Sequence, residues 1–169
     1  LSVEDFMLLG LTTRLKASFA AAALRLPQVR REEAQAREQV KGELALFGLS
    51  DLRRGARLES LPYGVRKRLD LARAVIGHPK ILLVDEPTSG LSASECDEVT
   101  AVLHTVIAQR GLTVVVVDHR VGFVTELCPT LLALDFGRVI ASGPSRSVLE
   151  TAAVRRAYFG TTDGTAVEP

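Results

Sequence analysis

The sequence has few cysteines, which could form disulfides, and few large aromatic residues, which often fill a core. It contains no tryptophan, one methionine and two cysteines, and 5% of its residues are aromatic. The two cysteines, Cys96 and Cys128, lie far apart and have no metal-ligand spacing. This pattern excludes a disulfide framework. Two lone thiols indicate a reducing compartment, and we expect both to be small buried side chains.

An excess of either charge is also absent, since 21 Lys and Arg face 20 Asp and Glu for a net charge of +1. This balance argues against broad electrostatic capture of nucleic acid, although it leaves room for a local basic patch. No secretory signal is visible, and no apolar run approaches the ~20 residues that a membrane span needs. Any association with a membrane is therefore expected to come through a partner.

What is present is typical of a globular protein, with 47% hydrophobic and 24% charged residues. A chain of 169 residues is long enough to bury one core. It begins at Leu1, with its methionine at Met7, and we expect it to be a fragment, a processed product or a trimmed form of a longer polypeptide.

The first third of the chain is predicted to be helical and polar. Alanine and arginine are frequent over residues 12–37, which Pro27 interrupts, and apolar residues then recur at helical spacing until Gly48 stops the helix. An arginine- and leucine-rich loop follows over residues 51–60. A second helix is expected after Gly64, with apolar residues on one face before Gly77 and Pro79 end it: Val65, Leu69, Ala72 and Ile76.

The middle of the chain predicts a βαβ unit. Residues 81–84 form a short, wholly apolar run, the pattern of a strand buried on both faces of a parallel sheet. Ser92 and Glu95 have capping-box spacing and predict the start of a helix that Gly111 ends. Residues 113–117 predict the second buried strand.

The last part of the chain predicts a hairpin and a tail. Residues 131–134 and 139–141 flank Asp135, Phe136 and Gly137, which suit a tight turn. One short helix is expected after Ser145, and the chain is expected to fray after Gly160. No internal repeat is visible.

Two adjacent carboxylates, Asp85 and Glu86, follow the first predicted strand at the sheet edge where α/β proteins bind ligands. Such a pair suits phosphoryl transfer, because one carboxylate can hold Mg²⁺ while the other orients or deprotonates an attacking water. The alternative is an ordinary strand end with acidic residues that start a turn. The pair alone does not separate these interpretations.

A histidine, His119, follows the second predicted strand and is therefore expected at the same edge of the sheet as the two carboxylates. Imidazole there can donate a hydrogen bond to a terminal phosphate, whereas a lone loop histidine would be the alternative. His78 precedes a proline in a turn and His104 lies inside a predicted helix, so we interpret both as structural.

A third candidate site lies where Gly64 precedes a helix. Glycine at a helix N-terminus lets backbone N–H groups approach an anion, and the helix dipole favours negative charge there. A simple loop is the alternative, since Pro62 lacks the hydroxyl often used to contact phosphate.

In this order, these features resemble the ATP-binding-cassette (ABC) ATPases over nearly the whole chain. Residues 61–65 and the following residues 66–74 match the signature loop and helix of that family, and residues 81–86 match its Walker B strand with the catalytic glutamate. Residues 89–92 match the D-loop of the family, and His119 matches its switch histidine. The resemblance implies an α/β fold: an incomplete P-loop NTPase (RecA-like) parallel sheet flanked by helices, with an N-terminal helical subdomain.

A narrower resemblance is to the ATP-binding subunits of branched-chain amino acid importers. It rests on the Leu-Pro-Tyr-Gly form of the signature, on residues 1–6 and 134–141, and on residues 157–160. Related cassettes for urea or for lipopolysaccharide export share much of this pattern. The implied protein would couple ATP hydrolysis to transport at the cytoplasmic face of the bacterial inner membrane.

The family roles carry over onto matching positions. Asp85 would support Mg²⁺, Glu86 would polarise the attacking water and His119 would contact the γ-phosphate of ATP. Ser92 would communicate across a homo- or heterodimer of ATP-binding subunits. A nucleotide held by the opposite subunit would be contacted by the signature residues Leu61, Pro62, Tyr63, Gly64 and Val65.

The resemblance also implies a division of the chain and a set of partners. Residues 1–76 would form the helical subdomain that touches the permease and ends in the signature loop and helix, residues 77–145 the C-terminal half of the ATPase core, and residues 146–169 a tail. The partners would be a second ATP-binding subunit, transmembrane permease subunits and, indirectly, a substrate-binding protein, with no nucleic acid.

Several positions depart from the widest family pattern. Pro62 stands in place of serine, Val65 in place of glutamine, and Ser92 in place of aspartate or asparagine. The 169 residues also contain no Gly-x-x-x-x-Gly-Lys-Ser/Thr phosphate loop. We therefore predict that this chain alone neither binds ATP tightly nor hydrolyses it, and that its incomplete sheet exposes apolar faces.

Two alternatives remain open at this point. A truncated, non-catalytic cassette that docks on a partner is favoured by Pro62, Val65 and the missing loop, and is opposed by Asp85, Glu86 and His119. A cassette acting on ribosomes or DNA is disfavoured by the near-neutral charge and by the lack of a long basic or coiled insertion.

Overall fold

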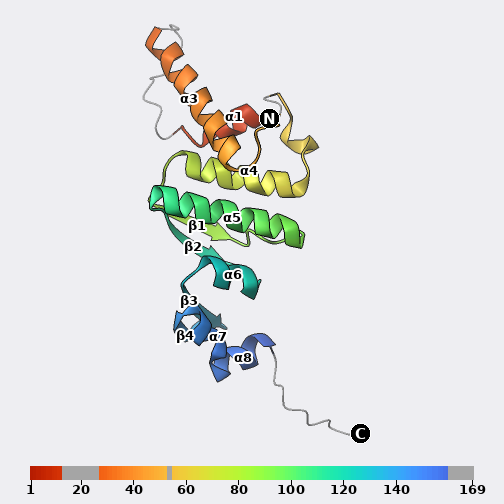
Figure 1. Cartoon of the computed structure of the whole chain (residues 1–169), viewed down its shortest axis with the longest axis vertical. Coiled ribbons are helices and arrows are strands. Elements are labelled where there is room, and N and C mark those ends of the chain that lie inside the picture. Colours follow the sequence, from red (N-terminus) through yellow and green to blue (C-terminus); the bar gives the residue numbers. More distant parts are fainter. Residues whose placement is uncertain (13–26, 53–54, 160–169) are drawn as a thin grey trace. The chain divides into compact units, whose positions relative to one another are not determined.

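The computed structural model describes residues 1–12, 27–52 and 55–159 (Figure 1). The chain forms two compact units, Leu1–Asp118 and His119–Pro169, and each is described by itself. Within the described ranges, no helix is both long enough and apolar enough to cross a bilayer.

The described residues at the start of the first unit form helices α1 (Val3–Leu9), α3 (Pro27–Leu46) and α4 (Tyr63–Ile76), with a short 3-10 turn, η1 (Leu58–Ser60), before α4. The helices α1, α3 and α4 contact one another in all pairings (Figure 1). Gly10, after α1, lies so close to α4 that an added Cβ would overlap the Arg73 carbonyl. Fully buried side chains fill the space between the helices, among them Met7, Phe47, Leu69 and Ile76.

One sequence prediction for this region needs correction, and another is not tested. Pro27, which was expected to interrupt the helical stretch, is the first residue of α3, and the residues before it lie outside the described ranges. Proline is favoured at that position because the first helical N–H has no intrahelical partner. The second helix was expected after Gly64 but begins at Tyr63, so Gly64 lies in its first turn. Gly48 follows α3 with φ 65°, as its predicted role as a stop requires. The predicted helical stretch over residues 13–26 lies outside the described residues.

The rest of the first unit is the predicted βαβ unit, made of β1 (Ile81–Asp85), α5 (Ala93–Arg110) and β2 (Thr113–Val117). The strands pair in parallel, with Leu83 opposite Val115. The capping box is confirmed: the Ser92 side chain accepts from the Glu95 N–H, and the Glu95 carboxylate accepts from the Ser92 N–H. Gly111 ends α5 in the left-handed conformation, with φ 60°.

The expectation that these strands are buried on both faces is wrong for the residues described here. Leu82 and Val84 are buried, but apolar side chains on the opposite face are exposed: Ile81 by 60%, Leu83 by 75%, Val115 by 51% and Val117 by 62%. Successive strand residues point to opposite faces, so the alternation means that the described chain covers only one face of the two-stranded sheet. The predicted exposure of an apolar sheet face is confirmed.

The second unit contains α6 (Val121–Leu127), β3 (Thr130–Asp135), β4 (Arg138–Pro144), α7 (Ser145–Glu150) and α8 (Ala152–Phe159). The predicted hairpin is confirmed, since β3 and β4 are antiparallel. Phe136 and Gly137 form its turn, with φ values of 44° and 75°. Positive φ at both central residues is typical of a tight two-residue hairpin turn.

The prediction of a single helix after Ser145 is wrong, because α7 and α8 are separate helices. The extended backbone of Thr151, with ψ 136°, divides them. The Thr151 hydroxyl also donates to the Val148 carbonyl at 2.7 Å, which satisfies a C-terminal carbonyl of α7. Gly160 and the predicted fraying lie outside the described residues. Of the two cysteines, Cys96 is buried as expected, whereas Cys128 is only partly buried.

Candidate functional site

The carboxylates of Asp85 and Glu86 stand at the carboxyl end of β1, and both residues are exposed. The Glu86 N–H donates to the Val117 carbonyl at 2.7 Å, which extends the pairing with β2 by one residue. Glu86 also has a φ of 44°, in the left-handed region. That conformation costs a non-glycine residue about 1–2 kcal/mol, and such costs are concentrated at functional sites.

The loop after Glu86 is held by hydrogen bonds at several points. Within the loop, the Ser89 N–H donates to the Glu86 carbonyl at 3.2 Å, and the Leu91 N–H donates to the Thr88 carbonyl at 3.1 Å. Thr88 is completely buried. Its N–H and its hydroxyl both donate to the carboxylate of Asp118, the residue that follows β2. The sequence interpretation missed Thr88 and Asp118, because no local pattern links residues 30 positions apart.

A lysine from α4 also reaches this loop. Lys67 Nζ donates to the backbone carbonyl of Glu86 at 3.1 Å. The same ammonium lies 5.8 Å from the centre of the Tyr63 ring, and the Arg66 guanidinium lies 5.7 Å from it, both in the range of cation–π contacts. Lys67 was not among the predicted site residues, since only its position within a basic helix was visible in the sequence.

The predicted signature residues surround the start of α4. Pro62 is the N-cap residue and makes no side-chain capping bond, while Tyr63 is 46% exposed. Gly64 is buried, and an added Cβ there would overlap the Glu95 carboxylate. Leu61 precedes the cap, and Val65 is partly buried within the first turn of the helix.

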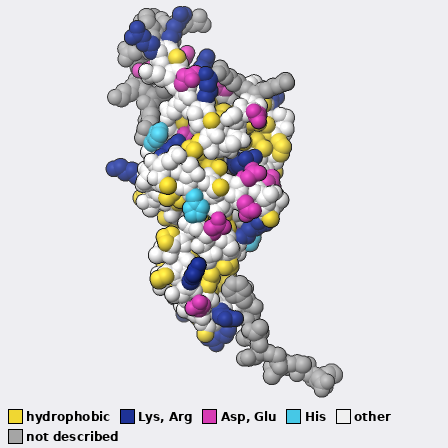
Figure 2. Space-filling model, in the orientation of Figure 1, with side chains coloured by type: hydrophobic (Ala, Val, Ile, Leu, Met, Phe, Trp, Pro, Cys, Tyr) yellow, Lys and Arg dark blue, Asp and Glu magenta, His cyan; other side chains and the backbone are white. Residues whose placement is uncertain are grey.

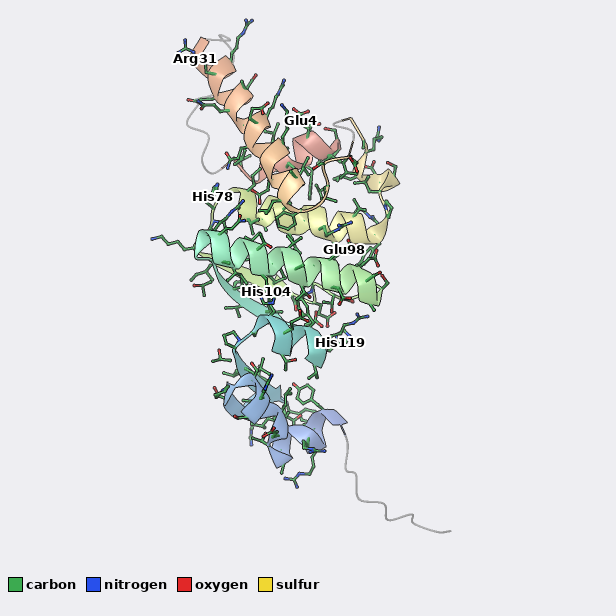
Figure 3. All side chains as sticks on the ribbon, in the orientation of Figure 1. Glu4, Arg31, His78, Glu98, His104 and His119 are labelled. Carbon is green, nitrogen blue, oxygen red and sulfur yellow. The ribbon has the colours of Figure 1, made fainter. Side chains whose placement is uncertain are left out.

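The signature residues and the loop after β1 contact each other within this one chain. A Cβ added at Gly90, whose φ is 75°, would lie 2.9 Å from Cε1 of Tyr63. Gly90 therefore provides the space in which the Tyr63 ring packs. An ion pair between Arg68 and Glu98 at 2.7 Å also joins α4 to α5; Glu98 is labelled on α5 in Figure 3.

Ser92 fixes the beginning of α5. Hydrogen bonds from the Ser92 backbone N–H and then from its hydroxyl hold the pKa of the Glu95 carboxyl below its ordinary value. Ser92 and Gly64 are thus both tied to Glu95, one by hydrogen bonds and one by close packing. This places the predicted D-loop serine and the predicted signature glycine around one carboxylate.

The predicted histidine, His119, is the first residue of the second unit and precedes Arg120, the N-cap residue of α6 (Figure 3). Its proposed contact with a phosphate stays a prediction. His104 lies on α5, as expected, and His78 follows the end of α4 with φ 47°. The described residues include no group of three or more His, Cys, Asp or Glu that would by itself enclose a metal ion. On the face shown in Figure 2, acidic and basic side chains are interspersed.

The chain is similar to known proteins of one family. The family model described as "ABC transporter" matches residues 7–89, a segment that includes α4, β1 and the two carboxylates. The chain is a relative of the ABC transporter ATPases. This match agrees with the resemblance to the ABC ATPases that the sequence predicts.

Curated ABC relatives differ in what their names say they transport. The high-affinity branched-chain amino acid transport ATP-binding protein BraF of Pseudomonas aeruginosa is 27% identical over 159 residues, which cover 94% of this chain and 62% of that protein. The methionine import protein MetN of Carboxydothermus hydrogenoformans is 36% identical over 63% of this chain and 33% of its own length. The lipopolysaccharide export protein LptB of Haemophilus influenzae is 31% identical over 75% of this chain and 52% of its own.

Solved ABC cassettes share the fold. The ATP-binding cassette MJ1267 superposes with a TM-score of 0.75 at 21% identity, over 93% of this chain and 62% of that one. The cassette cbiO1 of Clostridium perfringens superposes with a TM-score of 0.70 at 24% identity, over 92% of this chain and 55% of that one. The fold is therefore the α/β, P-loop NTPase type that the sequence predicted. This chain spans about three fifths of the length of BraF and MJ1267, at 62% of each.

Proposed function

We propose that this chain is the C-terminal part of an ATP-hydrolysing subunit of an ABC importer, and that the intact subunit drives the uptake of branched-chain amino acids. The observation that carries the proposal is the pair of exposed carboxylates at the end of β1, in a chain related to ABC ATPases. Glu86 among them has strained backbone, which favours a catalytic role over an ordinary strand end.

In this proposal, the side chains of the site divide the work of phosphoryl transfer. Glu86 orients the attacking water and accepts its proton, and His119 donates a hydrogen bond to the γ-phosphate. Asp85 fits Mg²⁺, because this cation usually takes one or two carboxylates and fills its remaining positions with phosphate oxygens and water. Bound there, Mg²⁺ would neutralise charge on the phosphates.

The proposal extends to the division of the chain and to its partners. Residues 1–76 would contact the permease, residues 77–145 would carry hydrolysis and residues 146–169 would form a tail. The signature residues 61–65 and Ser92 would face the nucleotide of a second ATP-binding subunit. The assembly would sit at the cytoplasmic face of the inner membrane beneath permease subunits that receive their solute from a binding protein.

Glu86→Gln tests catalysis in the full-length protein. This substitution removes the proton acceptor but keeps the size of the side chain, so we expect ATP turnover to fall about 100-fold or more while ATP binding is retained. Glu98→Gln, which alters a glutamate on α5, is the matched control and should change turnover less than about twofold. Equal turnover of Glu86→Gln and the unmodified protein would overturn the catalytic role.

Transport of leucine, methionine and lipopolysaccharide separates the possible substrates. A strain whose gene carries Glu86→Gln should lose uptake of branched-chain amino acids and keep uptake of methionine and export of lipopolysaccharide. Loss of one of the other two activities would reassign the substrate within the same family.

A non-catalytic cassette is the second candidate, favoured by Pro62 and Val65 in the signature residues. It predicts no Glu86-dependent turnover even in the full-length protein, together with retained binding to a partner subunit. The 169-residue polypeptide by itself is expected to show no turnover under either candidate, because it contains no phosphate loop.

A further inference from the structure

We propose that Lys67 is a positioning residue for Glu86: its ammonium holds the peptide of the proposed catalytic glutamate in the left-handed conformation. The inference rests on the proposed function, because it takes Glu86 as the residue that orients water. It adds a residue from the helix of the signature segment to the machinery of the same chain.

The Glu86 backbone needs support from its surroundings. A φ of 44° is unfavourable for glutamate and persists only when surrounding contacts determine it. The N–H of Glu86 is held by Val117 at 2.7 Å on one side. On the other side, the Glu86 carbonyl accepts from Lys67 Nζ at 3.1 Å and from the Ser89 N–H at 3.2 Å.

Contacts with neighbouring groups also restrict the position of the Lys67 side chain. Lys67 is half-buried, and its ammonium lies 5.8 Å from the Tyr63 ring, which packs on Gly90 of the same loop. A lysine that is free to rotate would give little directional support, because ordering its long side chain costs rotamer entropy. The ring and the carbonyl together restrict the ammonium to one location.

The support of the Glu86 backbone affects the direction of the Glu86 carboxylate. The peptide conformation of Glu86 decides where its carboxylate points, since the side chain leaves the backbone at the strained residue. Losing the Lys67 contact leaves one charged hydrogen bond fewer to offset the strain. A displacement of about 1 Å at a reacting group is enough to slow a reaction about 100-fold.

The experiment measures steady-state ATP hydrolysis by the full-length protein in the variants Lys67→Met, Lys67→Arg, Arg66→Met and Glu86→Gln. We expect Lys67→Met to lower kcat about 10- to 100-fold with KM for ATP changed less than about twofold. Lys67→Arg keeps a cationic donor and should restore kcat to within about threefold of the unmodified protein.

Arg66→Met is the matched control, because Arg66 contacts the same Tyr63 ring but has no described hydrogen bond to Glu86. It should leave kcat within about twofold. Should Lys67→Met fail to fold, Lys67→Gln, which keeps a neutral donor, carries the same test. An unchanged kcat in the lysine variants, an equal loss in Arg66→Met, or a raised KM at constant kcat would overturn the inference.

Glu86→Gln separates failure of the positioning role of Lys67 from failure of the proposed function. If Glu86→Gln abolishes turnover while Lys67→Met does not, the positioning role fails and the proposed function stands. If Glu86→Gln leaves turnover unchanged, the proposed function fails and the positioning role fails with it.

Discussion

Thr88 and Asp118 are joined by two hydrogen bonds that end on one carboxylate oxygen. The Thr88 N–H lies 3.1 Å and the Thr88 hydroxyl 2.7 Å from Asp118 Oδ2. Thr88 comes two residues after Glu86, and Asp118 comes directly after β2. The pair therefore anchors the loop of the candidate site to the end of the neighbouring strand, at a residue that is completely buried.

Replacing Thr88 by valine should destabilise the protein. The substitution preserves the shape of the side chain and removes the hydroxyl, so the loss should be about 1.5–3 kcal/mol, the usual range for a hydrogen bond to a charged group. Urea denaturation of the full-length protein measures it. Thr105→Val is the control, because the Thr105 hydroxyl bonds only to the Ala101 carbonyl of its own helix in the described residues. Equal losses in both variants would contradict a specific role for the Asp118 bond.

Arg110 and Glu43 form an ion pair that ties α5 to α3. Arg110 Nη2 lies 2.8 Å from Glu43 Oε2, and its Nη1 donates to the Val75 carbonyl at 3.0 Å. The Glu43 side chain is 3% exposed. Arg110→Met leaves this carboxylate buried without its cation and should cost about 3–5 kcal/mol in urea denaturation.

The double variant Arg110→Met/Glu43→Met should be more stable than Arg110→Met alone, because it removes the buried charge as well. Lys41→Met breaks the exposed pair with Glu38 on the same helix α3 and should cost less than about 0.5 kcal/mol. If the double variant is no more stable than the single one, the cost does not arise from an unpaired buried charge.

The Glu95 carboxyl should titrate below its ordinary value of 4.5, because the Ser92 N–H and hydroxyl stabilise its ionised form. The folded-state pKa is the lower one, so this contribution to stability is present above the unfolded-state pKa and is lost as the pH falls through the folded-state pKa. Carbon-detected NMR titration measures the midpoint. Ser92→Ala should move it up toward 4.5 and leave that of Glu59, which is lowered mainly by Arg57, in place. An unmoved Glu95 midpoint would contradict the assignment.

The 169-residue polypeptide should self-associate through the face of the β1–β2 sheet that the described residues leave uncovered. In that part of the chain four large apolar side chains are exposed on this face, and an open sheet face with unpaired edges promotes association. Leu83→Thr with Val115→Thr should shift the distribution toward monomer in sedimentation velocity. Leu9→Gln, which alters an exposed leucine on α1, should have a smaller effect. A monodisperse monomer with a sharp cooperative melt in the unmodified polypeptide would contradict this prediction.

Local patterns predicted the βαβ unit and the hairpin because each depends on neighbours in sequence. The apolar runs at residues 81–84 and 113–117, the capping box of Ser92 and the turn at Gly137 all act within a few residues. The sequence predicted one tail helix where there are two, because the boundary between α7 and α8 depends on the extended backbone of Thr151. Threonine does not usually end a helix as glycine or proline does.

Contacts between distant segments could not be predicted in the same way. The support of Glu86 by Lys67 spans 19 residues and depends on how α4 lies beside the end of β1. The one-sided burial of β1 likewise follows from what packs on the sheet, and strands of Val, Leu and Ile look alike in sequence whether one face or both are covered. Motifs therefore predict the candidate site residues, whereas the contacts around Glu86 depend on the packing of distant segments.

The close approach of Tyr63 to Gly90 constrains how this chain can vary. A side chain at position 90 would press against the ring, its Cβ lying 2.9 Å from Tyr63 Cε1, and would also have to adopt a φ of 75°, so glycine is strongly favoured while tyrosine stands at position 63. A small residue at position 63 would relieve the overlap but not the backbone requirement. Among relatives, the two positions should therefore covary: an aromatic residue at 63 should occur with glycine at 90, and other residues at 90 should occur where position 63 is small and the loop backbone has changed.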